Sequence, residues 1–463
     1  MRTVPPFLAA CLLLNLAPPG VQARTTPFEL EPVLGATAFV QPALMSGPGY
    51  TLDPHVEIRG YMAQFTLDTP QGPVRAESVE ILADRVAEMP ALETLDAMTH
   101  SQAFIDAASD SVTRTGAGIG QVLMHPIKTL AGIPRGVARY FGKRFDKLGR
   151  QAQSLSDHAA KELGNAGDPY PRADGPMTET RDIDRAEAAT QLADTDYGWV
   201  GDAGSEIARE LKRQIKYSQV RRELAERLGI DPYTSNPYLR ERLDQLAWAG
   251  SGGRYAAGAA LASVGGVGAV VLDKGSQLNE LVWKLDGPQL REFNAERLER
   301  YCRDNLLMRQ FLRRGTFTPT LQTALVDQLA ALQPANGCDA MLELGMTAQS
   351  ELEARYLVNS LQLVSARLGR RAHGGSLLVV GAGLAYDTED GERVLPLPVD
   401  YLAWTSEVEA FIDRPEFRHR EKTILISGQS TMRSQRELTS RGWNLVIEEG
   451  RSAPYPDRLA KAD

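Results

Sequence analysis

The fold is decided most clearly by residues 423–447, TILISGQSTMRSQRELTSRGWNLVI. Two short apolar runs, at 423–426 and 444–447, predict buried strands, because each is bounded by turn or helix signals. The stretch between them, 431–441, predicts a helix. A strand, a helix and a second strand at this spacing predict a right-handed crossover that joins two parallel strands.

The chain just before this unit predicts more structure of the same kind. Apolar runs at 376–380 and 394–397 flank a polar turn at 387–391, which predicts a hairpin. Residues 401–412 predict a helix. Together with the crossover, these elements predict a small C-terminal α/β unit.

The middle of the chain predicts helices from Ser205 to about Leu368. Ser205 is a suitable N-cap, and the turn residues 229–232 predict the end of the first helix. Later helices are expected after 234–237 and at 290–301, 319–332 and 350–368. We interpret the charged faces of these helices as solvated surface.

The N-terminal part predicts strands followed by helix. Residues 50–78 predict a small hairpin around the turn at 69–73. Helical periodicity begins near Ser78, and Pro90 is expected to divide it into two short helices. The expected fold class is therefore α+β and predominantly helical, with an N-terminal β-hairpin with helices, a large helical middle and a small C-terminal α/β unit.

The first residues have the pattern of a secretory signal peptide. Arg2 is followed by the apolar run 7–17, and helix-breaking residues at 18–20 precede small residues at a cleavage position after Ala23. We expect an exported protein, periplasmic or secreted. An alternative is a lipoprotein leader that would acylate Cys11, although the apolar run continues past this cysteine.

These patterns divide the chain into a signal peptide at 1–23, an N-terminal hairpin plus helices at 24–162, a linker at 163–185, a helical domain at 186–370, a small α/β unit at 371–452 and a flexible tail at 453–463.

Composition excludes several classes of protein. The 463 residues include 51 Lys and Arg against 59 Asp and Glu, a net charge of −8, and 43% are hydrophobic. That balance excludes collagen-like, wholly disordered and polytopic membrane proteins. The acidic balance also argues against a nucleic-acid partner, because such proteins carry an excess of Lys and Arg.

Two cysteines remain after the expected cleavage, Cys302 and Cys338. In an oxidising compartment they are expected to form a disulfide. The alternative is two separate buried thiols that pack as small apolar side chains.

No catalytic, cofactor or metal motif is recognisable in the sequence, so whether the chain is an enzyme stays open. Residues 380–383 (VGAG) lack the third glycine and the following helix of a dinucleotide site, so no nucleotide and no cofactor is expected. The six histidines form no metal-binding pair or cluster. An exported hydrolase using Ser430 with His373 or His419 is an alternative, but Ser430 or Thr431 fits better as a helix N-cap.

The clearest candidate site is a basic amphipathic helix at 133–150. Aromatic and apolar side chains lie on one predicted face, and cations fill the remainder, with Asp146 as the only acid. The candidate membrane- or partner-binding residues are Arg135, Arg139, Phe141, Lys143, Arg144, Phe145 and Lys147. Such a helix suits the interface of an anionic membrane. The alternative is a helix packed on its own domain, with its cations paired to acids elsewhere in the chain.

A second segment, 256–272 (AAGAALASVGGVGAVVL), is apolar but too short to span a bilayer. We interpret it as a closely packed buried segment, and a membrane-inserting or pore-forming hairpin is the alternative. The leading hypothesis is thus an exported, non-enzymatic protein of the cell envelope that binds a membrane surface or an envelope protein through 133–150.

Overall fold

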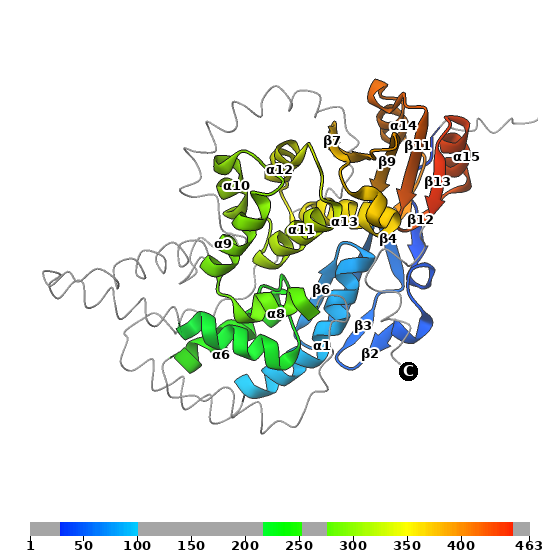
Figure 1. Cartoon of the computed structure of the whole chain (residues 1–463). Coiled ribbons are helices and arrows are strands. Elements are labelled where there is room, and N and C mark those ends of the chain that lie inside the picture. The colour runs from blue at the N-terminus through cyan, green and yellow to red at the C-terminus, as the bar shows by residue number, and fades with distance from the viewer. Residues whose placement is uncertain (1–27, 101–215, 252–275, 448–463) are drawn as a thin grey trace, which may run out of the picture.

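The structure, a computed structural model, describes residues 28–100, 216–251 and 276–447. The fold is mixed α and β, and about half of the described residues are helical. Two β-sheets lie on one side of the molecule and most of the helices lie on the other (Figure 1). One continuous cluster of buried apolar side chains runs from Ala36 to Trp443 and includes residues of all three described ranges.

Six short antiparallel strands form the N-terminal sheet. They are β1 (Val33–Gly35), β2 (Ser46–Gly47), β3 (Tyr50–Leu52), β4 (His55–Arg59), β5 (Met62–Thr69) and β6 (Gly72–Ala76). The strand order is β1-β4-β5-β3-β2, and β6 pairs with β5. The predicted hairpin around the turn at 69–73 is present as β5–β6, and it is part of this larger sheet. Strands of this length bury enough apolar surface only when several share one face.

Helix α1 (Val79–Thr99) begins where the sequence predicts, because the side chain of Ser78 accepts a hydrogen bond from the backbone N–H of Ile81 (3.0 Å). The predicted break at Pro90 is wrong, since α1 continues through this residue. Proline removes one helical hydrogen bond. Met89 and Leu92, on either side of it, are buried in the core, and this burial offsets the loss.

The middle of the described chain is helical, as predicted. Residues 216–228 form a helix that ends at Gly229, which has a φ of 67°. The others are α6 (Pro237–Ser251), α8 (Ser276–Lys284), α9 (Gly287–Leu298), α10 (Asn305–Leu312), α11 (Pro319–Leu332), α12 (Cys338–Met346) and α13 (Glu351–Leu368). The predicted 319–332 and 350–368 helices correspond to α11 and α13. Helices α8, α10 and α12 were not predicted, because each has only two to three turns of periodic sequence.

The C-terminal sheet contains the crossover that the opening stretch predicts. Its strands are β7 (Ser376–Val380), β8 (Gly383–Asp387), β9 (Glu392–Leu397), β11 (Glu421–Ile426) and β13 (Asn444–Ile447), in the order β13-β11-β9-β8-β7. β11 and β13 are parallel, and α15 (Met432–Ser440) connects them. β9 is also parallel to β11, whereas β7, β8 and β9 form an antiparallel meander.

Two expectations for this unit are wrong. The predicted hairpin between 376–380 and 394–397 contains an additional strand, β8, which is buried at nearly every position and so shows no alternation. Gly381, with a φ of 61°, allows the tight turn between β7 and β8. The predicted helix at 401–412 is present as α14 (Ser406–Ile412), but its predicted start is wrong, because Tyr401–Leu402 forms strand β10, which pairs with β12 (Gln429–Ser430).

Candidate functional site

The predicted binding residues lie outside the described structure. Residues 133–150, with Arg135, Arg139, Phe141, Lys143, Arg144, Phe145 and Lys147, belong to the stretch 101–215, and the apolar segment 256–272 belongs to 252–275. The structure nevertheless shows where the chain leaves and re-enters the described fold on either side of these stretches.

Helices α1 and α6 pack side by side and run in the same direction. Just before α6 begins, the Asn236 amide donates to a carboxylate oxygen of Glu88, which lies at the middle of α1 (2.9 Å). Further along, Arg242 Nε donates to Asp96 (2.9 Å). Residue numbers rise together along both helices, so their C-terminal ends, at Thr99 and Ser251, lie at the same end of the pair.

The first described turn of the helix that ends at residue 228 lies at this same end. The Tyr217 hydroxyl donates to Asp244 of α6 (2.6 Å), and the Tyr217 ring packs on Trp248, with 5.3 Å between ring centroids. The described residues therefore stop at His100, resume at Lys216 and stop again at Ser251 at one end of this three-helix group.

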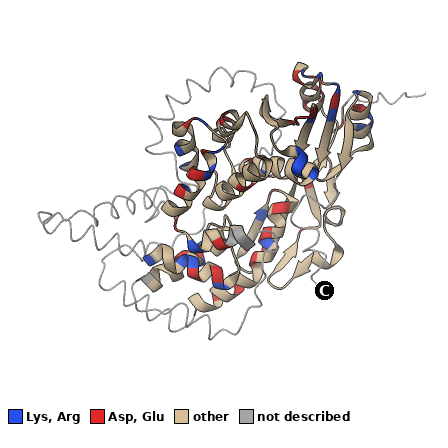
Figure 2. Ribbon diagram, in the orientation of Figure 1, with Lys and Arg blue, Asp and Glu red and all other residues tan. Residues whose placement is uncertain are grey.

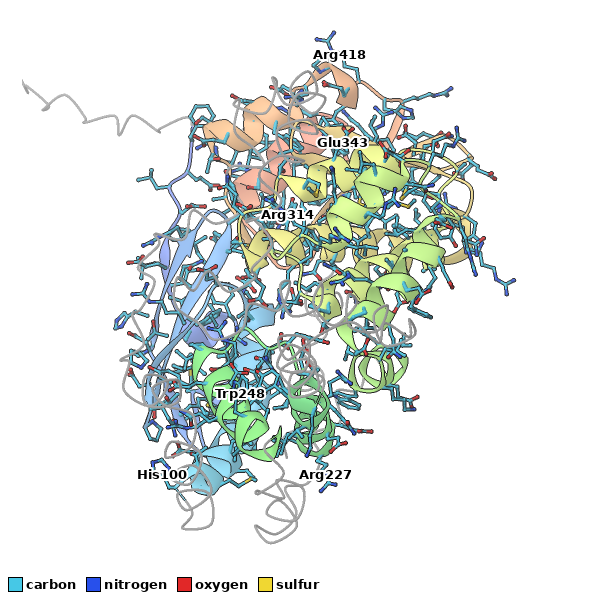
Figure 3. All side chains as sticks on the ribbon, turned by 90° about the vertical axis from the view of Figure 1, so that its left-hand side faces the viewer. His100, Arg227, Trp248, Arg314, Glu343 and Arg418 are labelled. Atoms are coloured by element: carbon cyan, nitrogen blue, oxygen red, sulfur yellow. A yellow bond between two sulfur atoms is a disulfide. The ribbon has the colours of Figure 1, made fainter. Side chains whose placement is uncertain are left out.

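We call His100, Lys216, Tyr217, Trp248 and Ser251 the exit end. Figure 3 shows His100 at the end of the molecule opposite Arg418. The ranges 101–215 and 252–275, which contain the two segments, therefore adjoin the exit end at His100, Lys216 and Ser251, although the segments lie far apart in sequence. Charged side chains of both signs are interspersed along α1 and α6 (Figure 2).

A cluster of buried charges joins α1 to α13. Arg355 forms ion pairs with Glu80, Asp84 and Glu351, each with an N–O distance of 2.8 Å. These four side chains are only 15–22% exposed. The charged face of α13 was expected to be solvated, and this is wrong for Glu351 and Arg355.

A second guanidinium, that of Arg85, extends the cluster towards the loop before α6. It donates to Glu88 (3.1 Å) and to the Ser235 hydroxyl (2.5 Å). Glu88 also accepts hydrogen bonds from the Thr234 hydroxyl and the Asn236 amide. The cluster thus links α1, α13 and the loop at 231–236.

The environment of the cluster shifts the titration of its carboxyl groups. Burial raises the pKa of Glu80 and of Glu88. Burial acts in the same direction on Glu351, but Arg355 and Arg85 outweigh it and lower the pKa of that carboxyl. Shifted carboxyl groups also mark active sites. Here Glu80, Glu88 and Glu351 are held by arginine, hydroxyl or amide donors, so the arrangement supports a structural role.

The described residues bring together no group of three or more His, Cys, Asp or Glu side chains that could hold a metal ion. Within 28–100, 216–251 and 276–447, no helix has the length and apolar character needed to cross a bilayer.

The alternative hydrolase site is not assembled among the described residues. The Ser430 hydroxyl accepts a hydrogen bond from the Gln435 amide (3.1 Å), and Nδ1 of His419 contacts the carbonyl of Glu421 (2.9 Å). No hydrogen bond joins Ser430 to His419 or His373 in this part of the chain. Thr431 is the N-cap of α15 and accepts from the backbone N–H of Ser434 (3.0 Å), as one of the two predicted capping residues.

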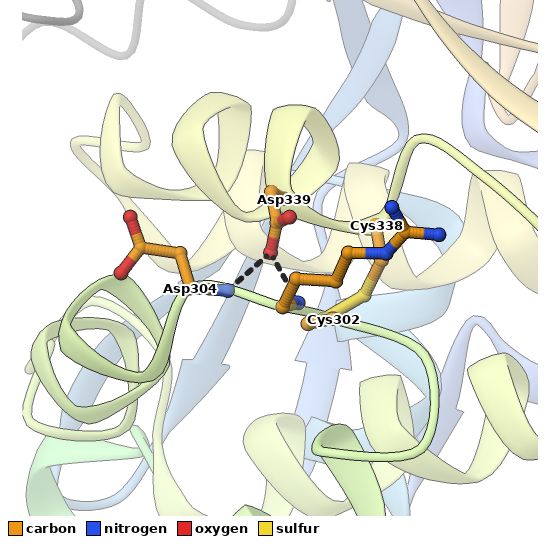
Figure 4. The surroundings of a disulfide bond; sticks show 5 residues. Cys302, Asp304, Cys338 and Asp339 are labelled. Atoms are coloured by element: carbon orange, nitrogen blue, oxygen red, sulfur yellow. Dashed lines mark hydrogen bonds between the residues drawn. A yellow bond between two sulfur atoms is a disulfide. The ribbon is translucent and has the colours of Figure 1, made fainter.

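The predicted disulfide is present. Cys302 and Cys338 are bonded, with their Cα atoms 5.0 Å apart. Both residues are buried, at 3% and 2% exposure. Beside them a carboxylate oxygen of Asp339 accepts the backbone N–H groups of Arg303 (2.9 Å) and Asp304 (3.1 Å) (Figure 4). The bond and these contacts fix the start of α12 against the segment between α9 and α10.

Comparison with known protein families, curated proteins and solved structures finds no match to this chain.

No sequence pattern distinguishes Arg85 and Arg355, which each contact several carboxylates, from ordinary surface cations. The spacing of Glu351 and Arg355 predicts an ion pair on one helix face, but that pattern is the same for exposed and buried pairs. Only the packing of α13 on α1 distinguishes them.

Proposed function

We propose that the chain is an exported protein of the cell envelope that acts by binding an anionic membrane surface through the basic amphipathic segment at 133–150. The observation that carries this proposal is the exit end. The described residues His100, Lys216 and Ser251, which flank 101–215 and precede 252–275, all lie at this end, and this supports a basic segment and an apolar segment that act on the same side of the protein.

The ion pairs among the described residues support a basic segment whose cations are available to an anionic surface. The partly buried carboxylates of Glu80, Asp84 and Glu351 are already paired with Arg355. Asp96 is likewise paired with Arg242 close to the exit end (2.8 Å). These acids therefore do not require the cations of 133–150 for neutralisation.

Export is supported by two independent features. The leader at 1–23 has the composition of a secretory signal peptide. The disulfide between Cys302 and Cys338 is of the kind that forms and persists in oxidising compartments.

Flotation with vesicles tests the proposal. The mature protein, residues 24–463, should float with vesicles that contain phosphatidylglycerol and should remain at the bottom with neutral phosphatidylcholine vesicles. Replacing Arg139, Lys143, Arg144 and Lys147 together by Glu should lower the partition coefficient at least about a thousandfold, because each cation near an anionic leaflet contributes about 1 kcal/mol.

A matched control changes the net charge equally at exposed sites elsewhere. Replacing Arg303, Arg313, Arg418 and Arg420 by Glu should leave flotation within about threefold of the original, since these residues are outside the proposed surface. Absence of flotation of the original protein, or equal loss in both variants, would contradict the proposal. A protein partner bound through 133–150 would instead give a complex that forms without lipid.

Insertion by 256–272 is a second candidate, favoured only by its departure from the same exit end. Vesicles loaded with a self-quenched dye distinguish the two, because surface binding leaves the dye inside, whereas a pore releases it.

A further inference from the structure

Asp400 lies where the N-terminal sheet meets the C-terminal unit. Its Oδ2 atom accepts hydrogen bonds from the backbone N–H of Ala63 in β5 (3.0 Å) and of Val79, the first residue of α1 (3.1 Å). Its own backbone N–H donates to the carbonyl of Tyr61 (3.1 Å). One side chain thus contacts two elements that precede it by more than 300 residues.

The turn between β4 and β5 is the other half of this junction. Tyr61 has a φ of 66°, which is unusual for a residue other than glycine, and is 2% exposed. Its hydroxyl lies 2.6 Å from that of Thr405, and its backbone N–H donates to Glu31 (2.6 Å). Contacts with the C-terminal unit therefore hold this turn in a conformation that costs free energy.

Glu80 of α1 acts on Asp400 by repulsion and is itself paired with Arg355 of α13. The junction also contains the phenols of Tyr61 and Tyr401, whose pKa values are raised mainly by burial. Three further carboxyl groups face these residues: Glu31 accepts the backbone N–H of Tyr61, Glu29 accepts that of Trp404, and Glu407 acts on the Tyr61 phenol by repulsion. No Lys, Arg or His among the described residues forms an ion pair with Asp400.

This environment favours the neutral carboxyl. Burial, and to a smaller extent Glu80, raise the pKa of Asp400 to about 7, although the hydrogen bonds from Ala63 and Val79 act in the opposite direction. The protonated side chain still accepts through one oxygen, so the neutral form retains both backbone contacts.

We propose that Asp400 is a pH-sensitive switch at the junction of the two sheets, closed when its carboxyl group is protonated and loosened when that group ionises. This regulation is independent of the membrane binding proposed above, since it involves only the junction of residues 61–79 with 400–405.

Proton linkage decides whether the junction becomes more or less stable as pH rises. The native state binds the Asp400 proton more tightly than the unfolded chain, whose ordinary pKa is near 4. The stabilisation is therefore complete below about pH 4 and is lost as pH rises through about 7. Between pH 5.5 and pH 8 the opening equilibrium of the junction should increase about thirtyfold.

Hydrogen–deuterium exchange of the full mature chain, read by mass spectrometry and corrected for the intrinsic pH dependence of amide exchange, measures this opening. Peptides that cover 61–80 and 398–405 should exchange about thirtyfold faster at pH 8 than at pH 5.5. In the Asp400→Asn variant, which keeps an oxygen acceptor, the difference should fall below about threefold.

A control separates the junction from general stability. Burial also raises the pKa of Asp231 to about 6, in the loop before α6, where it accepts from the Thr320 hydroxyl (2.8 Å). Asp231→Asn should leave the pH response of peptides 61–80 unchanged. The proposal is overturned if the original protein shows no pH difference at the junction or the opposite one, or if Asp400→Asn retains the full difference.

Discussion

Replacing Arg355 with methionine is expected to lower the free energy of unfolding by about 3–5 kcal/mol, because it leaves buried carboxylates without their cation. Arg355 is the shared partner of Glu80, Asp84 and Glu351, and it connects α1 to α13. Methionine preserves most of the apolar stem, so the loss reports the ion pairs more than the packing. Urea denaturation at pH 7.5, followed by circular dichroism, measures it.

The matched control is Arg371→Met. Arg371 also pairs with two carboxylates, Asp390 (2.8 Å) and Glu392 (3.0 Å), but its side chain is 57% exposed. An exposed pair contributes less than about 1 kcal/mol, so this variant should be nearly as stable as the original. Similar losses in both variants would contradict the structural role assigned to the buried cluster. The loss at Arg355 should also shrink at pH 5, where the carboxylates left unpaired take up protons.

Replacing Cys302 and Cys338 together by serine is expected to lower the free energy of unfolding by about 3–4 kcal/mol, the value that loop entropy gives for a closure of this length. The bond joins residues 36 apart in sequence and holds the start of α12. Reducing the original protein should lower its stability by a similar amount. A doubly substituted variant as stable as the oxidised protein would show that the bond is dispensable.

Much of the fold follows from local patterns. The crossover at 423–447, the helices α11 and α13 and the start of α1 at Ser78 all have strong periodicity or an unambiguous cap. Strand β8 was missed because all but the last of its residues are buried, and a strand of this kind has no alternating pattern. The helix break predicted at Pro90 is absent, because burial of the neighbouring side chains of Met89 and Leu92 outweighs the tendency of proline to end a helix.

Of the sites that the structure describes, the sequence predicts the disulfide but not the contacts of Asp400. The cysteine pair was recognised because few thiols remain in a chain with a leader, and the bond is present. Asp400 carries no motif, since its partners are backbone amides contributed by Ala63 and Val79. Contacts between residues so distant in sequence depend on how the two sheets pack, and a single sequence does not encode that arrangement in any local pattern.

The most direct test of the envelope-binding proposal is hydrogen–deuterium exchange of the mature protein with and without phosphatidylglycerol vesicles. We predict slower exchange on vesicles in peptides that cover 133–150 and in peptides that contain His100, Tyr217 and Trp248 of the exit end. Peptides around Arg418, at the opposite end of the molecule (Figure 3), should be unchanged. Vesicle-dependent protection around Arg418 without any at 133–150, or no protection anywhere, would contradict the proposal.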